Sequence, residues 1–153
     1  MFPVCRRAWR TQPDFASVNF EEEGAEEVAQ LLHSRGVGIE LGLSSPTDAV
    51  RALTKGWDKR CVRILLETSE TDVALALANI KTVERILDEA HTSAPRLLHG
   101  SEMTTWPLLI EAVRRGYQCR VGFEDTLRLP TGELAARNAQ LVSVARALME
   151  SES

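Results

Sequence analysis

The segment CRVGFEDTL, residues 119–127, places two adjacent carboxylates, Glu124 and Asp125, shortly after an arginine, Arg120. Because side chains alternate along a strand, we expect Arg120 and Glu124 to share the inward face, with Gly122 leaving space between them and Asp125 at the rim. A buried arginine and carboxylate cost several kcal/mol of desolvation unless they are paired or bind something. The segment therefore predicts either an internal Arg120–Glu124 ion pair, with Asp125 capping the next loop, or a carboxylate for a metal beside a cation for an anionic substrate.

Two further polar residues interrupt apolar runs. Glu40 lies in VGIELGL, residues 37–43, on the same strand face as Gly38 and Gly42, which leave room for a ligand. Since glutamate is rarely buried without a partner, Glu40 is either a surface or rim residue or an acid/base group tuned by its surroundings. His99, in RLLHG, is the one histidine of three that falls at the end of a predicted strand. A structural role and a ligand contact are both open for it.

These side chains need a scaffold, and the sequence predicts one by its alternation of short apolar runs with stretches of helical period. Runs rich in Val, Ile and Leu predict strands at 15–20, 37–43, 61–67, 96–100 and 119–125. Helical patterns fill the intervals, at about 25–35, 45–55, 70–90, 104–115 and 138–149. The fold class is therefore α/β with a parallel sheet, either an open doubly wound sheet or consecutive units of a (β/α)8 barrel. In both, ligands bind at the carboxyl ends of the strands.

Composition narrows the function further. With 153 residues, 44% hydrophobic, the chain is expected to be a single domain, 1–153. A net charge of −4, with the cationic residues spread along the chain, argues against nucleic acid as a partner. The three cysteines, at 5, 61 and 119, have no C-x-x-C spacing, which predicts neither disulfides nor a thiolate zinc site and favours the cytoplasm. No apolar run approaches the roughly 18 residues that cross a bilayer, and the first ten residues lack a signal-peptide core, so neither membrane insertion nor export is expected.

The segment RVGFEDTL, followed by TGELAARNAQLV, resembles the end of the β-keto acid cleavage enzymes, the group that includes 3-keto-5-aminohexanoate cleavage enzyme. There the last barrel strand reads approximately R-x-G-x-E-D and is followed by G-x-x-A-x-x-N-A-x-L-V. The matching residues are Arg120, Gly122, Glu124 and Asp125, and then Gly132, Ala135, Asn138, Ala139, Leu141 and Val142. PDFASVNF, GVGIELGL and RLLHG with its following TTWP also resemble the family's fourth, fifth and seventh strands, so the resemblance extends over essentially the whole chain.

The resemblance implies a partial (β/α)8 barrel in which this chain supplies strands four to eight, and a divalent metal, usually zinc. It implies a Claisen-type exchange, in which a β-keto acid and acetyl-CoA give acetoacetate and a new CoA thioester. Matched position by position, Glu124 corresponds to the carboxylate metal ligand and Asp125 to the acid/base residue beside it. Arg120 corresponds to a cation near the substrate, and Glu40 to the active-site glutamate of strand five.

The sequence departs from the family pattern in its metal ligands. The family takes two further ligands from an H-x-H motif on the second strand, and no H-x-H occurs here. Because catalytic zinc usually has three protein ligands, strong zinc binding by Glu124 alone is not expected. Three hypotheses follow: a cleavage enzyme present as a truncated chain; a non-catalytic half-barrel that forms a homo-oligomer or binds a partner through its exposed edges; and an unrelated doubly wound ligand-binding domain.

Overall fold

The computed structural model describes residues 11–152; the first ten residues, with Cys5 and the segment tested for a signal peptide, lie outside the described residues, as does Ser153. The strands are β1 (Phe15–Asn19), β2 (Gly38–Leu43), β3 (Arg63–Leu66) and β4 (Arg96–Leu98). The helices are α1 (Ala25–His33), α2 (Pro46–Thr54), α3 (Val73–Glu89), a 3-10 turn η1 (Glu102–Thr104), α4 (Thr105–Arg114) and α5 (Asn138–Glu152). The predicted helices and the first four predicted strands agree with these elements to within a few residues.

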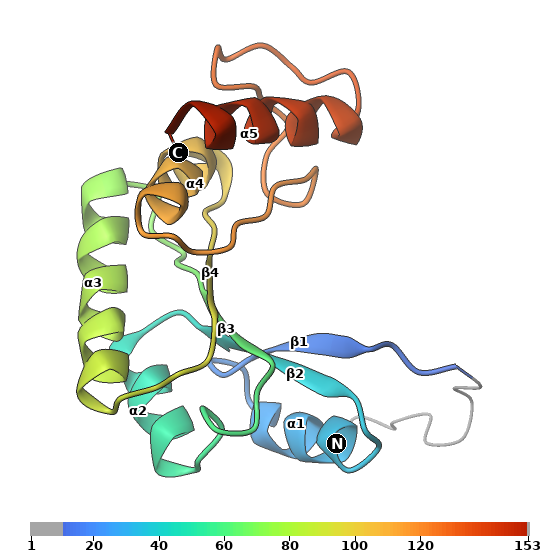
Figure 1. Ribbon diagram of the computed structural model, residues 1–153, viewed down its shortest axis with the longest axis vertical. Coiled ribbons are helices and arrows are strands. Elements are labelled where there is room, and N and C mark those ends of the chain that lie inside the picture. The colour runs from blue at the N-terminus through green and yellow to red at the C-terminus, as the bar shows by residue number, and fades with distance from the viewer. Residues whose placement is uncertain (1–10, 153) are drawn as a thin grey trace.

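The four strands form one parallel sheet in the order β1-β2-β3-β4, the same as their order in the chain. A doubly wound sheet reverses its strand order and carries helices on both faces. Here α1 to α4 all contribute to the core cluster on one face of the sheet, and Figure 1 shows them as a layer outside the strands. The fold is therefore an α/β arrangement of consecutive units, consistent with part of a (β/α)8 barrel.

The two faces of the sheet differ in chemistry because side chains alternate along each strand. One face is apolar and packs against the helices; its buried residues are Val18, Phe20, Ile39, Leu41, Leu43, Ile64, Leu66 and Leu98. We call the other face the inner face; its residues, including those that directly follow β3 and β4, are Ser17, Asn19, Gly38, Glu40, Gly42, Arg63, Leu65, Glu67, Leu97 and His99. The polar side chains of the inner face include residues of the candidate site.

The prediction of a fifth strand at 119–125 is wrong. The chain makes a single parallel bridge, between Leu97 and Gln118, and then leaves the sheet. It turns at Gly122, whose carbonyl accepts from the amides of Asp125 at 2.9 Å and Thr126 at 3.1 Å. The physical reason is the shortness of β4, which ends at Leu98 and offers no ladder partner to residues beyond Gln118.

The C-terminal helix α5 returns to pack on α4. A second apolar cluster joins them, made of Trp106, Leu109, Leu129, Leu141 and Ala145. The segment between Gly122 and α5 is thereby held at both ends, by the sheet and by this helix pair. Within residues 11–152, no helix combines the length and the apolar character needed to cross a membrane.

Candidate active site

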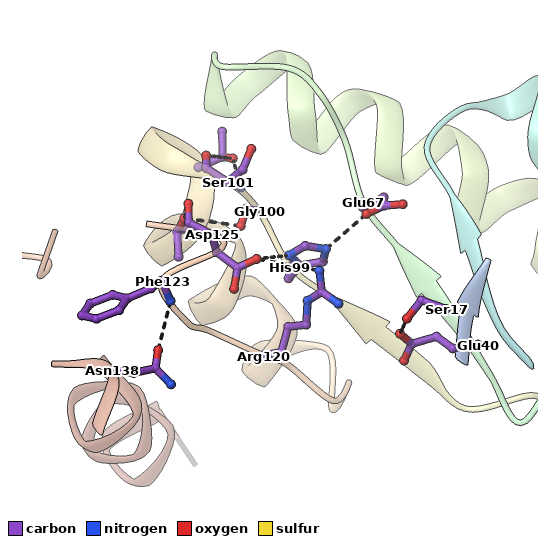
Figure 2. Close-up of polar contacts among 12 residues, drawn as sticks. Ser17, Glu40, Glu67, His99, Gly100, Ser101, Arg120, Phe123, Asp125 and Asn138 are labelled. Atoms are coloured by element: carbon purple, nitrogen blue, oxygen red, sulfur yellow. Dashed lines mark hydrogen bonds and ion pairs between the residues drawn. The ribbon is translucent and has the colours of Figure 1, made fainter. Parts of the chain in front are cut away.

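Four ionisable side chains meet where β3 and β4 end (Figure 2). His99 Nδ1 lies 3.1 Å from Asp125 Oδ1, and His99 Nε2 lies 3.3 Å from Glu67 Oε2. Arg120 completes the group, with its Nη2 atom 3.8 Å from Asp125 Oδ1. Glu67 and His99 directly follow β3 and β4, which is where parallel α/β folds bind ligands.

Asp125 is the buried carboxylate of the adjacent pair of acids in this segment, and its burial corrects the sequence prediction. Asp125 is 5% exposed, whereas Glu124, which was expected to point inward, is exposed. Arg120 accordingly pairs with Asp125 and not with Glu124. The period-two alternation on which the prediction rested ends with the ladder at Gln118, and the turn at Gly122 reverses which of the two acids is buried.

The backbone at Asp125 is held by the start of the helical segment that follows β4, formed by η1 and α4. Its carbonyl accepts from the amide of Glu102 at 2.7 Å and from the Thr105 hydroxyl at 3.3 Å. Gly100, just after His99, packs so closely on Thr104 that a Cβ there would lie 2.6 Å from the Thr104 carbonyl oxygen. These contacts fix the Asp125 turn against the strand end that carries His99.

Asn138, at the start of α5, ties the two sequence motifs together. Its Oδ1 atom accepts from the amide of Phe123 at 3.0 Å, as Figure 2 shows. A Cβ at position 122 would lie 3.1 Å from the same oxygen, so Gly122 gives Asn138 the space to reach the turn. The asparagine of the second motif thus stabilises the turn that carries the carboxylates of the first.

Gly42 provides space on the inner face. A Cβ there would collide with Asn19 Oδ1 and would lie 3.1 Å from Glu67 Oε1. The room that the sequence assigned to a ligand is therefore bordered by two side-chain oxygens of the protein itself. Glu67, which lies in the predicted strand 61–67, was not singled out from the sequence. The sequence feature that could have identified Glu67 is the one that identified His99: a polar residue at the carboxyl end of a predicted strand.

The neighbours of His99 shift the pKa of its imidazole. Burial by itself lowers the pKa of the imidazole, but the contacts with Asp125 and Glu67 outweigh this and raise it above the ordinary value, with Arg120 opposing them. Ionised carboxylates only accept hydrogen bonds, so a ring that satisfies both must carry protons on both nitrogens. Below its raised pKa, the His99 imidazolium lies between the carboxyl groups of Asp125 and Glu67, with the Arg120 guanidinium beside Asp125.

Glu40 is buried and paired, so its surface or rim interpretation is wrong. It is 1% exposed, accepts from the Ser17 hydroxyl at 2.5 Å and forms an ion pair with Arg63. Arg63 also donates to Gln118 Oε1 at 3.0 Å. Figure 2 shows Ser17 and Glu40 apart from the group around His99. The structure does not bring Glu40 into contact with Asp125 or Arg120.

The residues described do not form a zinc site by themselves. Within 11–152, no group of three or more His, Cys, Asp or Glu side chains is placed to hold a metal ion. Both nitrogens of His99 face carboxylates, and Glu124 can offer one carboxylate at the surface. Cys61 and Cys119, both free thiols, lie outside this group. The three protein ligands usual for catalytic zinc are thus not supplied by this part of the chain.

A cleft of about 290 Å³ lies over the motif, and Arg120, Gly122, Glu124, Asp125 and Asn138 line it. The Nε atom of Arg120 is buried and has no hydrogen-bond partner within residues 11–152. A larger cavity of about 650 Å³, lined mainly by apolar side chains of α3, α4 and residues 126–132, shares none of these residues. We favour the smaller cleft as the site, because it combines two carboxylates with a guanidinium whose Nε atom has no hydrogen-bond partner in the described part of the chain.

Comparison with known families decides the assignment. A family model described as beta-keto acid cleavage enzyme matches residues 10–152. The chain belongs to this family. The resemblance of residues 120–142 to β-keto acid cleavage enzymes is therefore confirmed, and the hypothesis of an unrelated doubly wound domain is wrong. No curated protein matches the sequence significantly.

In this β-keto acid cleavage enzyme family member, the Asn138→Ala substitution is expected to loosen the turn at 122–125. It removes the acceptor for the Phe123 amide, a net loss of about 1 kcal/mol for one hydrogen bond. Hydrogen exchange of the Phe123 amide should become faster. Asn138→Asp, which keeps the acceptor oxygen, is the control and should retain protection. Equal protection in Asn138→Ala and the wild type would contradict the role given to Asn138.

His99 should make stability depend on pH. Its folded-state pKa is raised above the unfolded value of about 6.5, so its contribution is complete below about pH 6.5 and is lost as pH rises through the folded pKa. The difference in free energy of unfolding between the wild type and His99→Gln is therefore expected to be larger near about pH 6 than near about pH 9. Denaturant unfolding at both values measures it. His33→Gln, at an exposed position on α1, is the control. A difference that grows with rising pH would disprove the assignment.

Proposed function

We propose that this chain takes part in the cleavage of β-keto acids by a Claisen-type exchange, in which a β-keto acid and acetyl-CoA give acetoacetate and a new acyl-CoA. Family membership supports the β-keto acid as substrate class. The observation that carries the proposal is the pairing of a buried carboxylate, Asp125, with the Arg120 guanidinium in one cleft. We include acetyl-CoA as the second substrate because of the family resemblance.

Arg120 is the anion-binding residue of the proposed site. A guanidinium binds a carboxylate through paired hydrogen bonds, and it also stabilises negative charge on an oxygen. The Nε atom of Arg120 has no partner in the described part of the chain, and its Nη2 atom is 3.8 Å from Asp125, too long for a hydrogen bond. A substrate carboxylate or enolate oxygen at the cleft would satisfy these donors.

Asp125 is the proposed acid/base residue. It lines the same cleft as Arg120, so a substrate bound to Arg120 lies within reach of its carboxylate. Asp125 takes a proton from the bound substrate and returns it to the product fragment, so the exchange consumes no net proton. A positioned acid/base group contributes roughly 10²- to 10⁴-fold to a rate.

Two further assignments belong to the proposal. We place β1 to β4 at the family's fourth to seventh strands and the segment after Gln118 at the eighth. Glu40 then matches the active-site glutamate of the fifth strand. On the inner face, Ser17 and Arg63 hold its carboxylate in place, two residues before the space at Gly42.

For zinc, Glu124 is the family metal ligand that the sequence matches, and its side chain borders the cleft. Further ligands have to come from outside the described residues, since these offer no set of three. The proposal therefore assigns one carboxylate to the metal and leaves substrate binding and proton transfer to Arg120 and Asp125.

The reaction is tested by incubating the purified chain with a β-keto acid and acetyl-CoA, with and without zinc, and following acetoacetate by NMR. Asp125→Asn is expected to lower kcat by about 10²-fold or more, because the amide cannot accept the proton. Arg120→Met is expected to raise KM as well, because it removes the cation. Asp14→Asn, an exposed aspartate, is the control. Acetoacetate formation that is equal in Asp125→Asn and the wild type would refute the assignment.

Zinc binding is tested separately by calorimetric titration of the chain. We expect weak binding, with Kd well above that of a three-ligand site, and its loss in Glu124→Gln. Glu133→Gln, another exposed glutamate, is the matched control and should bind as the wild type does. Stoichiometric zinc that Glu124→Gln retains would place the metal at other residues.

A further inference from the structure

We propose that Glu67 and His99 form a positioning pair for Asp125, in which Glu67 holds the imidazole of His99 and His99 holds the carboxylate of Asp125. This inference rests on the acid/base role proposed for Asp125. It adds two residues to the site, one of which, Glu67, has no place in the matched motifs. Neither residue has to touch the substrate to act in this way.

The geometry of the three residues carries the proposal. They come from three separate segments, the ends of β3 and β4 and the turn after Gly122, and they form a continuous chain of contacts. The side chains of His99 and Asp125 are 8% and 6% exposed, so water competes little for their contact. Each ring nitrogen faces a single carboxylate, at 3.1 Å for Asp125 and 3.3 Å for Glu67. The ring therefore cannot rotate without losing both contacts.

The number of protons on the His99 ring defines the role of Glu67. A neutral imidazole has one donor and one acceptor nitrogen, whereas both carboxylates require a donor when ionised. With Glu67 present, the form that carries a proton toward each carboxylate is the imidazolium, whose Nδ1 atom lies 3.1 Å from Asp125 Oδ1 in an ion-pair contact. Without the charge of Glu67, a neutral ring is sufficient, and the contact with Asp125 loses the positive charge of the ring. An opposite charge within about 4–6 Å favours the charged form of its partner, so the loss of that charge weakens the hold on Asp125.

The charges around His99 agree with this account. Glu67 and Asp125 both raise the pKa of His99, against the effects of burial and of Arg120. Glu67 is itself held in place by limited space, because its Oε1 atom is buried against Gly42 and lacks a hydrogen-bond partner within residues 11–152. The carboxylate of Glu67 thus has one oxygen on His99 and the other beside the space at Gly42.

A merely structural ion cluster would share this geometry, so the test needs two readouts that such a cluster would not change together. The first is the titration midpoint of the His99 ring, followed by NMR with labelled histidine; the sequence has only three histidines to assign. The second is the separation of kcat from KM in acetoacetate formation. Glu67→Gln keeps the size of the side chain and removes its charge, and the exposed Glu70→Gln is the matched control.

We expect Glu67→Gln to lower the His99 midpoint and to lower kcat by about 10- to 100-fold, the range typical of residues that orient another group, with KM close to the wild-type value. Glu70→Gln should change neither. Glu67→Asp, which keeps the charge on a shorter side chain, should recover part of both effects. It also serves as the test variant if Glu67→Gln does not fold, with a smaller fall expected in each quantity.

The outcomes separate this inference from the proposed function. An unchanged His99 midpoint in folded Glu67→Gln would overturn the positioning pair, whatever the activity of the wild type. A wild type that turns over, with a Glu67→Gln variant of equal kcat, would also overturn it. A lowered midpoint in a chain that forms no acetoacetate would establish that Glu67 acts on His99, and it would overturn the proposed function together with the acid/base role that the pair is proposed to position.

Discussion

Asp125 is 5% exposed, and a charge so placed needs compensation from nearby donors. His99 and Arg120 lie beside it, and for His99 the contacts with Asp125 and Glu67 together outweigh the burial that disfavours its charged form. The cluster holds equal numbers of positive and negative groups. Removal of His99 would leave Asp125 with Arg120 alone as its partner, at 3.8 Å, and a buried charge that loses a partner costs more than the pair contributes when intact.

The burial of Asp125 explains why glycines and an asparagine surround the cluster. Gly122 and Asn138 hold the turn that buries Asp125, and Gly42 leaves the space in which Glu67 lies. The two motifs of the family therefore form one structural unit: the first carries the ionisable groups, and the second fixes the turn that orients them. Their separation in the sequence is bridged by the packing of α5 on α4.

The sheet positions the remaining polar side chains. Its helices cover one face, and on the other face Glu40 accepts from Ser17 and forms an ion pair with Arg63, which also donates to Gln118. Glu40 is consequently placed by its partners on neighbouring strands and makes no contact with the Asp125 group. The group around Asp125 lies where β3 and β4 end, and ligands of parallel α/β folds bind at the carboxyl ends of the strands.

Local periodicity and residue types in fixed order were enough to predict the α/β class, the helices and first four strands, the family, and the segment that carries Arg120, Glu124 and Asp125. The prediction failed at the fifth strand, where the same apolar alternation occurs in a segment without a ladder partner. The burial of Asp125, the exposure of Glu124 and the contact of Glu67 with His99 became visible in the fold alone. Those facts depend on contacts between segments far apart in the chain, where a short β4 and a turn at Gly122 determine which side chains meet.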